Sequence, residues 1–221
     1  ENSTAGSIIP NYALIDEYDI SIVGEYYLQI THNLMALKGQ SLEDIKEVQS
    51  HPMALLQCRD FFKNNSSITL VEEKDTAQIA KKIADNKLKG LGAIASELAC
   101  KIYNLEIIKE NIQTIKQNQT RFVILQNIRP SENKNINKAS LKFELDHKRG
   151  SLATILNVLS DCKLNLTKIQ SMPKIQTPWR YSFFVDVTFD KKEHYFKAKS
   201  IVEIMAKEFK VLGEYKNAKD D

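Results

Sequence analysis

Glycine is scarce in this sequence, with 7 in 221 residues. Neither a G-x-G-x-x-G pattern nor a Walker A pattern occurs, which argues against a dinucleotide site and against a P-loop. No apolar run approaches the roughly 18–20 residues that a membrane span needs, so we expect no membrane partner. The 43% hydrophobic and 27% charged residues instead indicate a globular chain of one large or two modest domains.

Cysteine is also scarce, with three residues that form no C-x-x-C pair and have no histidine at ligand spacing. This pattern argues against a zinc site and against a disulfide framework. We therefore predict small buried thiols in a reducing, cytoplasmic compartment, with no metal and no cofactor.

Charge is distributed unevenly along the chain. Residues 1–126 hold 13 basic and 16 acidic residues, whereas residues 127–221 hold 18 basic and 12 acidic residues. The lysines of the second part are spread out, without an arginine-rich cluster or interleaved aromatic residues. We interpret them as a solvated surface and expect no nucleic-acid partner.

The charge change coincides with a polar, Asn-rich stretch that contains a proline, residues 127–139. We interpret this stretch as a linker between a domain at 1–126 and a domain at 140–221. The first domain is predicted to alternate helices and strands, which is typical of an α/β fold with a largely parallel sheet. Its expected elements are a helix through Ile8, Tyr12 and Ile15, an extended segment at 20–37, helices beginning at 41–44, 50–52, 75 and 96, and strands at 68–71, 91–95 and 121–126.

The second domain shows a different order of elements. Hydrophobic periodicity predicts strands at 140–146, 164–172, 180–187 and 209–215, with helices at 150–160 and 193–207. The order βαββαβ within about 80 residues is that of a ferredoxin-like unit.

Several short motifs occur in a fixed order along the chain. They are Glu1-Asn2-Ser3-x-x-Gly6, Ser50-His51-Pro52-x-Ala54-Leu55-x-Gln57-Cys58, Asp75-Thr76-Ala77, Ala93-Ile94-Ala95-Ser96 and Asn118-x-Thr120-Arg121-Phe122, followed by the βαββαβ unit. Over essentially its whole length, this pattern resembles prephenate dehydratase with a C-terminal ACT regulatory domain. The resemblance implies one lobe of a periplasmic-binding-protein-like two-lobe domain, followed by an α+β ferredoxin-like ACT domain.

The resemblance implies conversion of prephenate to phenylpyruvate, with loss of carbon dioxide and water, in phenylalanine biosynthesis. Hydroxide is a poor leaving group, so the enzyme must give it a proton or strong hydrogen bonds. By resemblance, Thr120 acts at the leaving hydroxyl. Arg121 either counters a substrate carboxylate or fixes the motif, and strand alternation allows it to point away. The implied substrate-binding residues are Asn2, Ser3, Ser50, Gln57 and Thr76.

Local sequence alone supports simpler roles for some of these residues. Ser50 and Asp75 each occupy a position typical of a helix cap, and Gln57 has the spacing of an exposed polar residue on a helix. His51 has no visible acidic partner, which favours a hydrogen-bonding role, and Phe122 is expected to pack. His32, His147 and His194 show no arrangement that indicates a site.

By resemblance, the ACT domain binds phenylalanine as an inhibitor, at a turn that in the family reads Gly-Ala-Leu-Val and here contains Gly150, Ser151 and Leu152. A glycine there allows close approach of a ligand, and the following helix N-terminus suits a carboxylate. The second family motif, Glu-Ser-Arg-Pro, lacks its acid and its arginine here, which puts the phenylalanine affinity in doubt. The implied residues on this strand are Asn165, Leu166, Gln170, Ser171, Met172 and Pro173.

The chain opens on Glu1, whereas family members carry a glycine-rich segment before the Glu-Asn-Ser motif. We therefore expect these 221 residues alone to lack turnover. Two other interpretations remain open, a non-catalytic phenylalanine-binding module and an arogenate dehydratase. ACT domains usually pair with one another, so a homodimer or homotetramer is expected.

Overall fold

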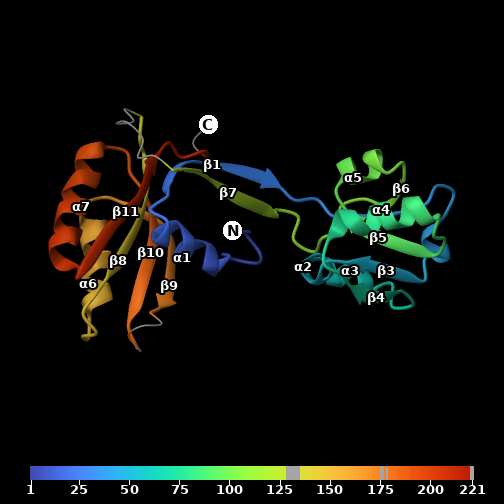
Figure 1. Ribbon diagram of the computed structural model, residues 1–221, viewed down its shortest axis with the longest axis horizontal. Coiled ribbons are helices and arrows are strands. Elements are labelled where there is room, and N and C mark those ends of the chain that lie inside the picture. The colour runs from blue at the N-terminus through green and yellow to red at the C-terminus, as the bar shows by residue number, and fades with distance from the viewer. Residues whose placement is uncertain (128–134, 175–176, 178, 220–221) are drawn as a thin grey trace. The chain divides into compact units, whose positions relative to one another are not determined.

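A computed structural model describes residues 1–127, 135–174, 177 and 179–219. By contacts, the chain divides into two units that each use separate stretches of sequence (Figure 1). The first unit is Glu1–Gly6 with Leu28–Thr120, and the second is Ser7–Tyr27 with Arg121–Asp221. These units differ from the predicted division into 1–126 and 140–221 at the segment 7–27, which makes its contacts with the C-terminal part of the chain.

The first unit is a five-stranded sheet with helices on both faces. The strand order is β4-β3-β5-β2-β6. Strand β3 runs parallel to β4 and β5, whereas β2 runs antiparallel to β5 and β6, so the sheet is mixed rather than largely parallel as predicted. Its elements are β2 (Asn33–Ala36), a 3-10 helix (Leu42–Asp44), β3 (Glu47–Ser50), α2 (Pro52–Gln57), α3 (Arg59–Lys63), β4 (Thr69–Glu72), α4 (Thr76–Asn86), β5 (Leu91–Ala95), α5 (Glu97–Ile102) and β6 (Glu106–Lys109).

Two helix caps that the sequence predicted are observed in this unit. Asp75 accepts a hydrogen bond from the backbone N–H of Gln78 at 2.9 Å, and Ser96 accepts one from Ala99 at 3.3 Å. The cap predicted at Ser50 is wrong, because His51 Nδ1 accepts the N–H of Met53 at 3.1 Å and begins α2. The four-residue strands β3 and β6 were not predicted, since so short a segment carries little periodicity.

Alternation along the central strands gives the sheet two apolar faces. On β2, Leu34 and Ala36 pack toward α2 and α3, whereas Met35 packs toward α4 and α5. All three side chains are completely buried. The core therefore lies on both faces of the sheet, between two helical layers. Polar functional side chains are expected in the loops that join the strands and helices.

The second unit contains the predicted βαββαβ order. Its sheet has the strand order β11-β8-β10-β9, and neighbouring strands are antiparallel. Lys138 and Ala139, predicted in the linker, are buried in β8, and residues 128–134 lie outside the described part of the chain. The elements are α1 (Ile9–Glu17), β8 (Lys138–Glu144), α6 (Ser151–Asp161), β9 (Asn165–Pro173), β10 (Tyr181–Thr188), α7 (Lys192–Met205) and β11 (Glu208–Tyr215).

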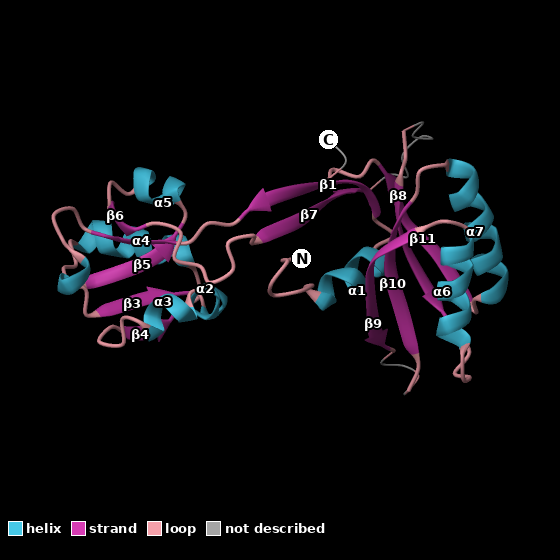
Figure 2. Cartoon of the chain, turned by 180° about the vertical axis from the view of Figure 1, so that it is seen from behind, coloured by secondary structure: helices cyan, strands magenta, loops and turns pink. Residues whose placement is uncertain are grey.

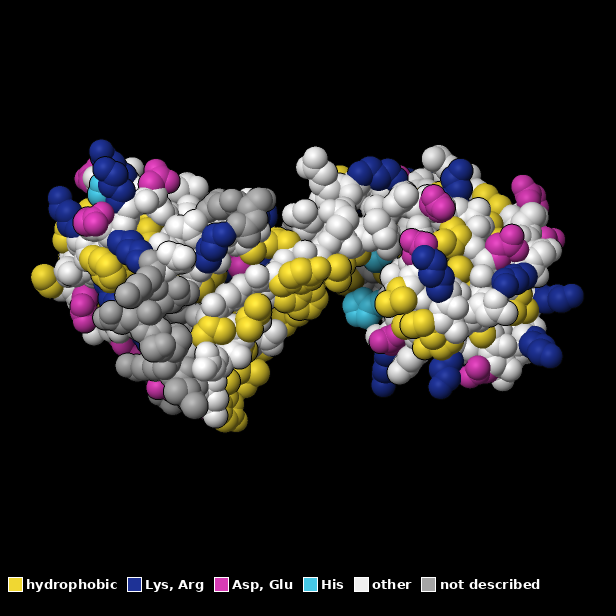
Figure 3. Space-filling model, turned by 90° about the horizontal axis from the view of Figure 1, so that it is seen from above, with side chains coloured by type: hydrophobic (Ala, Val, Ile, Leu, Met, Phe, Trp, Pro, Cys, Tyr) yellow, Lys and Arg dark blue, Asp and Glu magenta, His cyan; other side chains and the backbone are white. Residues whose placement is uncertain are grey.

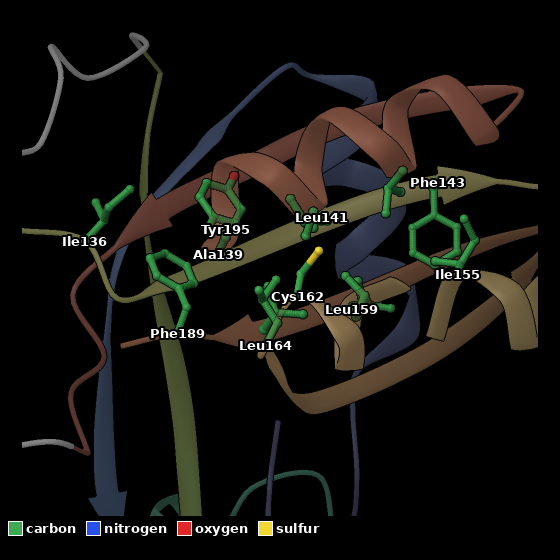
Figure 4. Close-up of a cluster of buried hydrophobic side chains, with 14 residues drawn as sticks. Ile136, Ala139, Leu141, Phe143, Ile155, Leu159, Cys162, Leu164, Phe189 and Tyr195 are labelled. Carbon is green, nitrogen blue, oxygen red and sulfur yellow. The ribbon is translucent and has the colours of Figure 1, made fainter. Parts of the chain in front are cut away.

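Both faces of this second sheet are covered. Helices α6 and α7 lie on one face, over a core that includes Leu141, Phe143 and Tyr195 (Figures 2 and 4). Helix α1 lies on the other face, where Ile15 packs with Phe184 of β10. The segment at 7–27 is thus a structural part of the second unit.

Strands β1 (Ser21–Gln29) and β7 (Gln119–Gln126) pair as a separate two-stranded sheet. Apolar side chains gather on the surface of these two strands (Figure 3). Tyr26, Phe122 and Ile124 are each more than half exposed. The expectation that Phe122 packs is therefore wrong. Between Phe122 and Thr120, the side chain of Arg121 turns to the opposite side and is buried.

The three cysteines are free thiols and are buried, as predicted. Burial raises the pKa of the Cys58 thiol to about 12. Among the helices that the structure describes, none has the length and apolar character needed to cross a membrane.

Candidate functional site

A cluster of amide and hydroxyl side chains gathers where the N-terminal segment meets the start of β7. Asn2 forms a bridge with Thr120, and the backbone N–H of Ser3 donates to the carbonyl of Gln119 at 2.8 Å. Residues 118 positions apart in sequence thereby become neighbours. All members of the cluster belong to the first unit.

The backbone fixes the orientation of the Asn2 amide. Its Oδ1 accepts the N–H groups of Thr4 and Ala5 at 2.9 and 3.0 Å, and its Nδ2 donates to the carbonyl of Gln119 at 3.2 Å. Backbone N–H groups only donate and carbonyl groups only accept, so the amide cannot be reversed without losing these bonds.

The orientation of Asn2 then fixes the next two amides. Asn2 Nδ2 donates to Asn118 Oδ1 at 2.7 Å, which turns Asn118 Nδ2 toward Gln57 Oε1 at 2.9 Å. Gln57 Nε2 in turn donates to Thr4 Oγ1 at 2.8 Å and to Asn2 Oδ1 at 3.2 Å. The three amides therefore form a closed, directional ring of hydrogen bonds.

A buried histidine supports this ring from behind. His32 Nε2 lies 2.7 Å from Gln57 Oε1, which is an acceptor, so His32 must carry its hydrogen on Nε2. Burial lowers the pKa of His32, although the bond to Gln57 acts in the opposite direction. At neutral pH the ring is thus held by an uncharged donor.

The hydroxyl of Thr120 receives a defined direction from the same ring. Asn2 Nδ2, whose two hydrogens are shared among three acceptors, lies 3.1 Å from Thr120 Oγ1, and since an amide nitrogen only donates, this oxygen is an acceptor within the cluster. Within the described residues, the Thr120 hydroxyl hydrogen has no acceptor, and it is free to donate to a bound molecule. The site can therefore present one oriented O–H donor beside several uncharged amides.

A pocket of about 270 Å³ opens beside the cluster. Its polar lining includes Thr4, Gln57 and Asn118, and its apolar lining is made by side chains of α2 and of the segment before β7. The remaining lining residues are Met53, Leu56, Arg59, Thr114 and Ile115. An apolar wall facing a few convergent polar groups is the usual character of a small-molecule site.

Comparisons with known proteins show the family of this chain. The family model for prephenate dehydratase matches residues 1–129, more than half of the chain. The chain belongs to the prephenate dehydratase family. It is 37% identical over 197 residues to a prephenate dehydratase of Methanocaldococcus jannaschii, covering 87% of this chain and 71% of that protein.

Some related proteins carry names that include arogenate as well as prephenate. The chain is 40% identical over 199 residues to arogenate dehydratase/prephenate dehydratase 2 of Arabidopsis thaliana, covering 84% of this chain and 51% of that protein. The chain thus spans about half the length of this curated relative.

Two solved structures share the fold over nearly all of the chain. The prephenate dehydratase of Staphylococcus aureus has a TM-score of 0.83 at 26% identity, covering 97% of this chain and 80% of that one. GqqA, described as a novel type of quorum quenching acylase, has a TM-score of 0.84 at 26% identity, covering 100% and 81%.

Of the first-unit residues that the resemblance implied, the structure brings some together and places others elsewhere. Asn2, Gln57 and Thr120 meet in the cluster, and Ser3 lies beside it, where its Oγ accepts the N–H of Gln119 at 2.9 Å. Ser50 is completely buried and donates to the carbonyl of Ile94 at 3.2 Å, apart from the cluster. Thr76 begins α4 and is outside the residues that line the pocket.

Arg121 turns away from the cluster, as strand alternation along the motif allowed. Its side chain is 5% exposed and forms ion pairs with Glu25 and Asp186, both in the second unit. Alternation along β7 explains this, because successive side chains point to opposite sides.

Sequence reasoning missed three residues of the site. Asn118 stands in a quoted motif, and its spacing of two from Thr120 on an extended segment was a usable signal for a shared face. Thr4 and His32 carried no such signal, because only tertiary contact brings them to Gln57.

The residues expected to bind phenylalanine lie at the two ends of the strands of the second sheet. Ser151 and Leu152 line a pocket of about 110 Å³ with Asp146, Arg180 and others. Ser182 of β10 pairs with both Glu144 and Met172, so Met172 lies at the same end of the sheet as this pocket, with Gln170, Ser171 and Pro173 nearby on β9. Asn165 and Leu166 begin β9 and therefore lie at its other end, so the set is not gathered in one place within the chain.

No group of three or more His, Cys, Asp or Glu side chains is placed to hold a metal ion in the parts of the chain that the structure covers. The cluster is made of neutral groups, which are poor metal ligands compared with thiolates and carboxylates.

Replacing His32 tests whether it holds the ring. We expect His32→Phe to lower kcat about fivefold, because one ordinary hydrogen bond of roughly 1 kcal/mol is lost. His32→Gln keeps an N–H donor and should stay within about twofold of the original kcat. Steady-state kinetics of prephenate turnover by the protein expressed from its full reading frame measure both variants. Equal losses of kcat in the two would contradict the supporting role of the His32 hydrogen bond.

The lowered pKa of His32 adds a stability readout to the same comparison. Below pH 6.5, the ordinary value, the unfolded chain binds a proton that the folded chain resists. The free energy of unfolding should therefore fall more steeply for the original chain than for His32→Gln as the pH decreases from 6.5.

Proposed function

We propose that this chain carries the catalytic residues of a prephenate dehydratase, and that Thr120 provides the hydrogen bond to the leaving hydroxyl. The observation that carries the proposal is the direction of the Asn2–Thr120 bond, which leaves the Thr120 hydrogen available to a substrate. A dehydration requires such a donor where the oxygen leaves.

The proposed reaction balances without a cofactor. The C–C bond to the ring carboxylate breaks and releases carbon dioxide, and its electron pair enters the ring. The ring becomes aromatic as the C–O bond to the ring hydroxyl breaks, and the departing oxygen takes up a proton from solvent and leaves as water. Thr120 stabilises the negative charge that develops on this oxygen, because its hydrogen bond strengthens as the bond breaks.

The neighbouring groups suit the rest of the substrate. The amide hydrogens of Gln57 and Asn118 offer hydrogen bonds without adding charge, and the apolar side chains of Met53, Leu56 and Ile115 suit contact with the ring. Arg59, also in the pocket lining, is the group that we assign to a substrate carboxylate. Thr76 remains a proposed binding residue at the N-terminus of α4.

We further propose that the first unit is one lobe of a periplasmic-binding-protein-like domain and that residues 138–215 form an ACT domain. The βαββαβ topology and the pocket beside Gly150 support the second assignment. Phenylalanine is its proposed effector, bound in a dimer or tetramer of the chain. Gln170 and Met172 replace the acid and the arginine of the family motif, so backbone groups must supply more of the binding.

The direct test is turnover by the protein expressed from its full reading frame. We expect phenylpyruvate to form from prephenate, measured by its ultraviolet absorbance, and arogenate serves as the competing substrate. A larger kcat/KM with arogenate would favour an arogenate dehydratase, in line with the plant relatives. Turnover of neither substrate, with phenylalanine still bound, would leave the non-catalytic binding module.

Gly150→Val tests the effector site. Gly150 has φ of +84°, which a β-branched residue adopts only with strain, and it precedes α6, where an amino-acid carboxylate would bind. We expect at least about a tenfold loss of phenylalanine affinity by calorimetry. Gly39→Val is the matched control, with φ of +79° in the other unit; equal losses in both would reject a specific role for Gly150.

A further inference from the structure

Four charged side chains are buried together in the second unit. Arg121 and Lys138 carry the positive charges, and Glu25 and Asp186 the negative ones, with side-chain exposures of 0% to 6%. Arg121 pairs with both carboxylates, and Lys138 Nζ lies 2.9 Å from Glu25 Oε2. We call these four residues the buried charge network.

Hydroxyl groups extend the buried charge network across the sheet. Arg121 Nη2 donates to the Tyr215 hydroxyl at 2.8 Å, and Ser140 Oγ donates to Asp186 Oδ1 at 2.6 Å. The hydroxyls of Ser140 and Tyr215 lie 2.7 Å apart, so Tyr215 donates to Ser140. Arg121 is thereby joined to β8, β10 and β11.

Such a network is not an efficient way to stabilise a fold. Removing charges from water costs several kcal/mol per ion, and apolar side chains of similar volume often serve stability equally well. What an arginine fork adds is geometry, because its planar donors accept carboxylates only in defined directions. The network therefore fixes the direction of the Arg121 side chain on β7.

Thr120 is the residue directly before Arg121. On a strand, successive side chains point in opposite directions, so fixing the Arg121 side chain also fixes the direction of Thr120. A small rotation of β7 would move Thr120 Oγ1 away from Asn2 Nδ2, and the direction of its hydroxyl hydrogen would change. Misplacement of a reacting group by about 1 Å is enough to lower a rate strongly.

We propose that Arg121 is a positioning residue: anchored by the buried charge network, it sets the position of the Thr120 hydroxyl. The inference rests on the proposed function of Thr120. Arg121 directly follows Thr120 in the chain and bonds to Asp186 of β10 and Tyr215 of β11. Arg121 itself contacts no substrate.

Asp186→Asn and Tyr215→Phe test the proposal in the active enzyme. Asp186→Asn removes one charge at constant shape, and we expect kcat to fall about tenfold with KM changed less than about twofold. Tyr215→Phe removes one hydroxyl, carries less risk to folding, and should lower kcat in the same direction by about two- to threefold. Phenylalanine should still bind both variants in calorimetry, with weaker inhibition.

Glu144→Gln is the matched control, since Glu144 is a largely buried carboxylate of the same sheet that pairs with Lys174 and is not joined to Arg121. It should leave kcat unchanged. Amide hydrogen exchange adds a readout that needs no turnover: Thr120 should exchange faster in Asp186→Asn but not in Glu144→Gln.

The two proposals fail in different ways. If neither Asp186→Asn nor Tyr215→Phe, once folded, alters kcat or Thr120 exchange relative to Glu144→Gln, the positioning role is overturned while the proposed function stands. If the original protein shows no turnover, the proposed function fails, and the exchange result alone decides whether Arg121 holds Thr120.

Discussion

Thr120→Ala is expected to lower kcat for prephenate by about 10²–10³-fold, with KM nearly unchanged. Removing one oriented hydrogen-bond donor from a developing oxyanion has an effect of this size. The interaction is made mainly as the C–O bond breaks, so its loss appears in kcat rather than in KM. Steady-state formation of phenylpyruvate by the active enzyme provides the measurement.

Thr120→Ser is the matched control, because it keeps the hydroxyl and loses one methyl group. It should retain most of the activity, apart from a modest loss due to greater rotational freedom. If Thr120→Ala and Thr120→Ser had the same kcat as the original enzyme, the oriented hydroxyl would play no part in the chemistry. An effect on KM alone would reduce Thr120 to a binding residue.

Gly213→Ala is expected to destabilise the second unit by about 3 kcal/mol or more. A Cβ atom at this position would lie 2.1 Å from the carbonyl oxygen of Ile22 and 2.6 Å from the Ile22 Cβ. The obstacle is backbone rather than a flexible side chain, so β1 or β11 must move. Thermal or urea unfolding of the purified chain measures the change.

Gly24→Ala provides the comparison for Gly213→Ala. An added Cβ at Gly24 would meet Ile124 Cδ1 at 3.5 Å, an ordinary van der Waals contact. Its effect should stay within about 1 kcal/mol. Similar unfolding midpoints for the two variants would show that the close packing of Ile22 on Gly213 is absent in solution.

Local sequence patterns were sufficient for much of the fold. Asp75 and Ser96 cap helices because the cap depends on side chains a few residues away, and the periodicity of 140–215 contains the whole βαββαβ order. The placement of residues 7–27 was not predictable, since an amphipathic helix does not indicate which sheet it will cover. Ile15 packs with Phe184, some 170 positions later, and only the folded chain reveals that partner.

The site residues were likewise only partly predictable from the sequence. Asn2, Gln57 and Thr120 were named by resemblance, and their side chains do meet. The side to which Arg121 turns was left open, because strand alternation shows that neighbours diverge but not which of them faces the site. His32 escaped notice because its role depends on Gln57 Oε1 being an acceptor, which follows from a ring of tertiary hydrogen bonds.

The interleaved course of the chain has a consequence for its synthesis. Residues 7–27 leave the ribosome well before β11, and the sheet that they cover is completed only when β11 has been made. Until then Ile15 and Ile22 lack their apolar partners, and Glu25 lacks Lys138. Residues 28–120 contain almost all of the first unit and can fold during this delay. The first unit is thus able to form before the second, which must await β11.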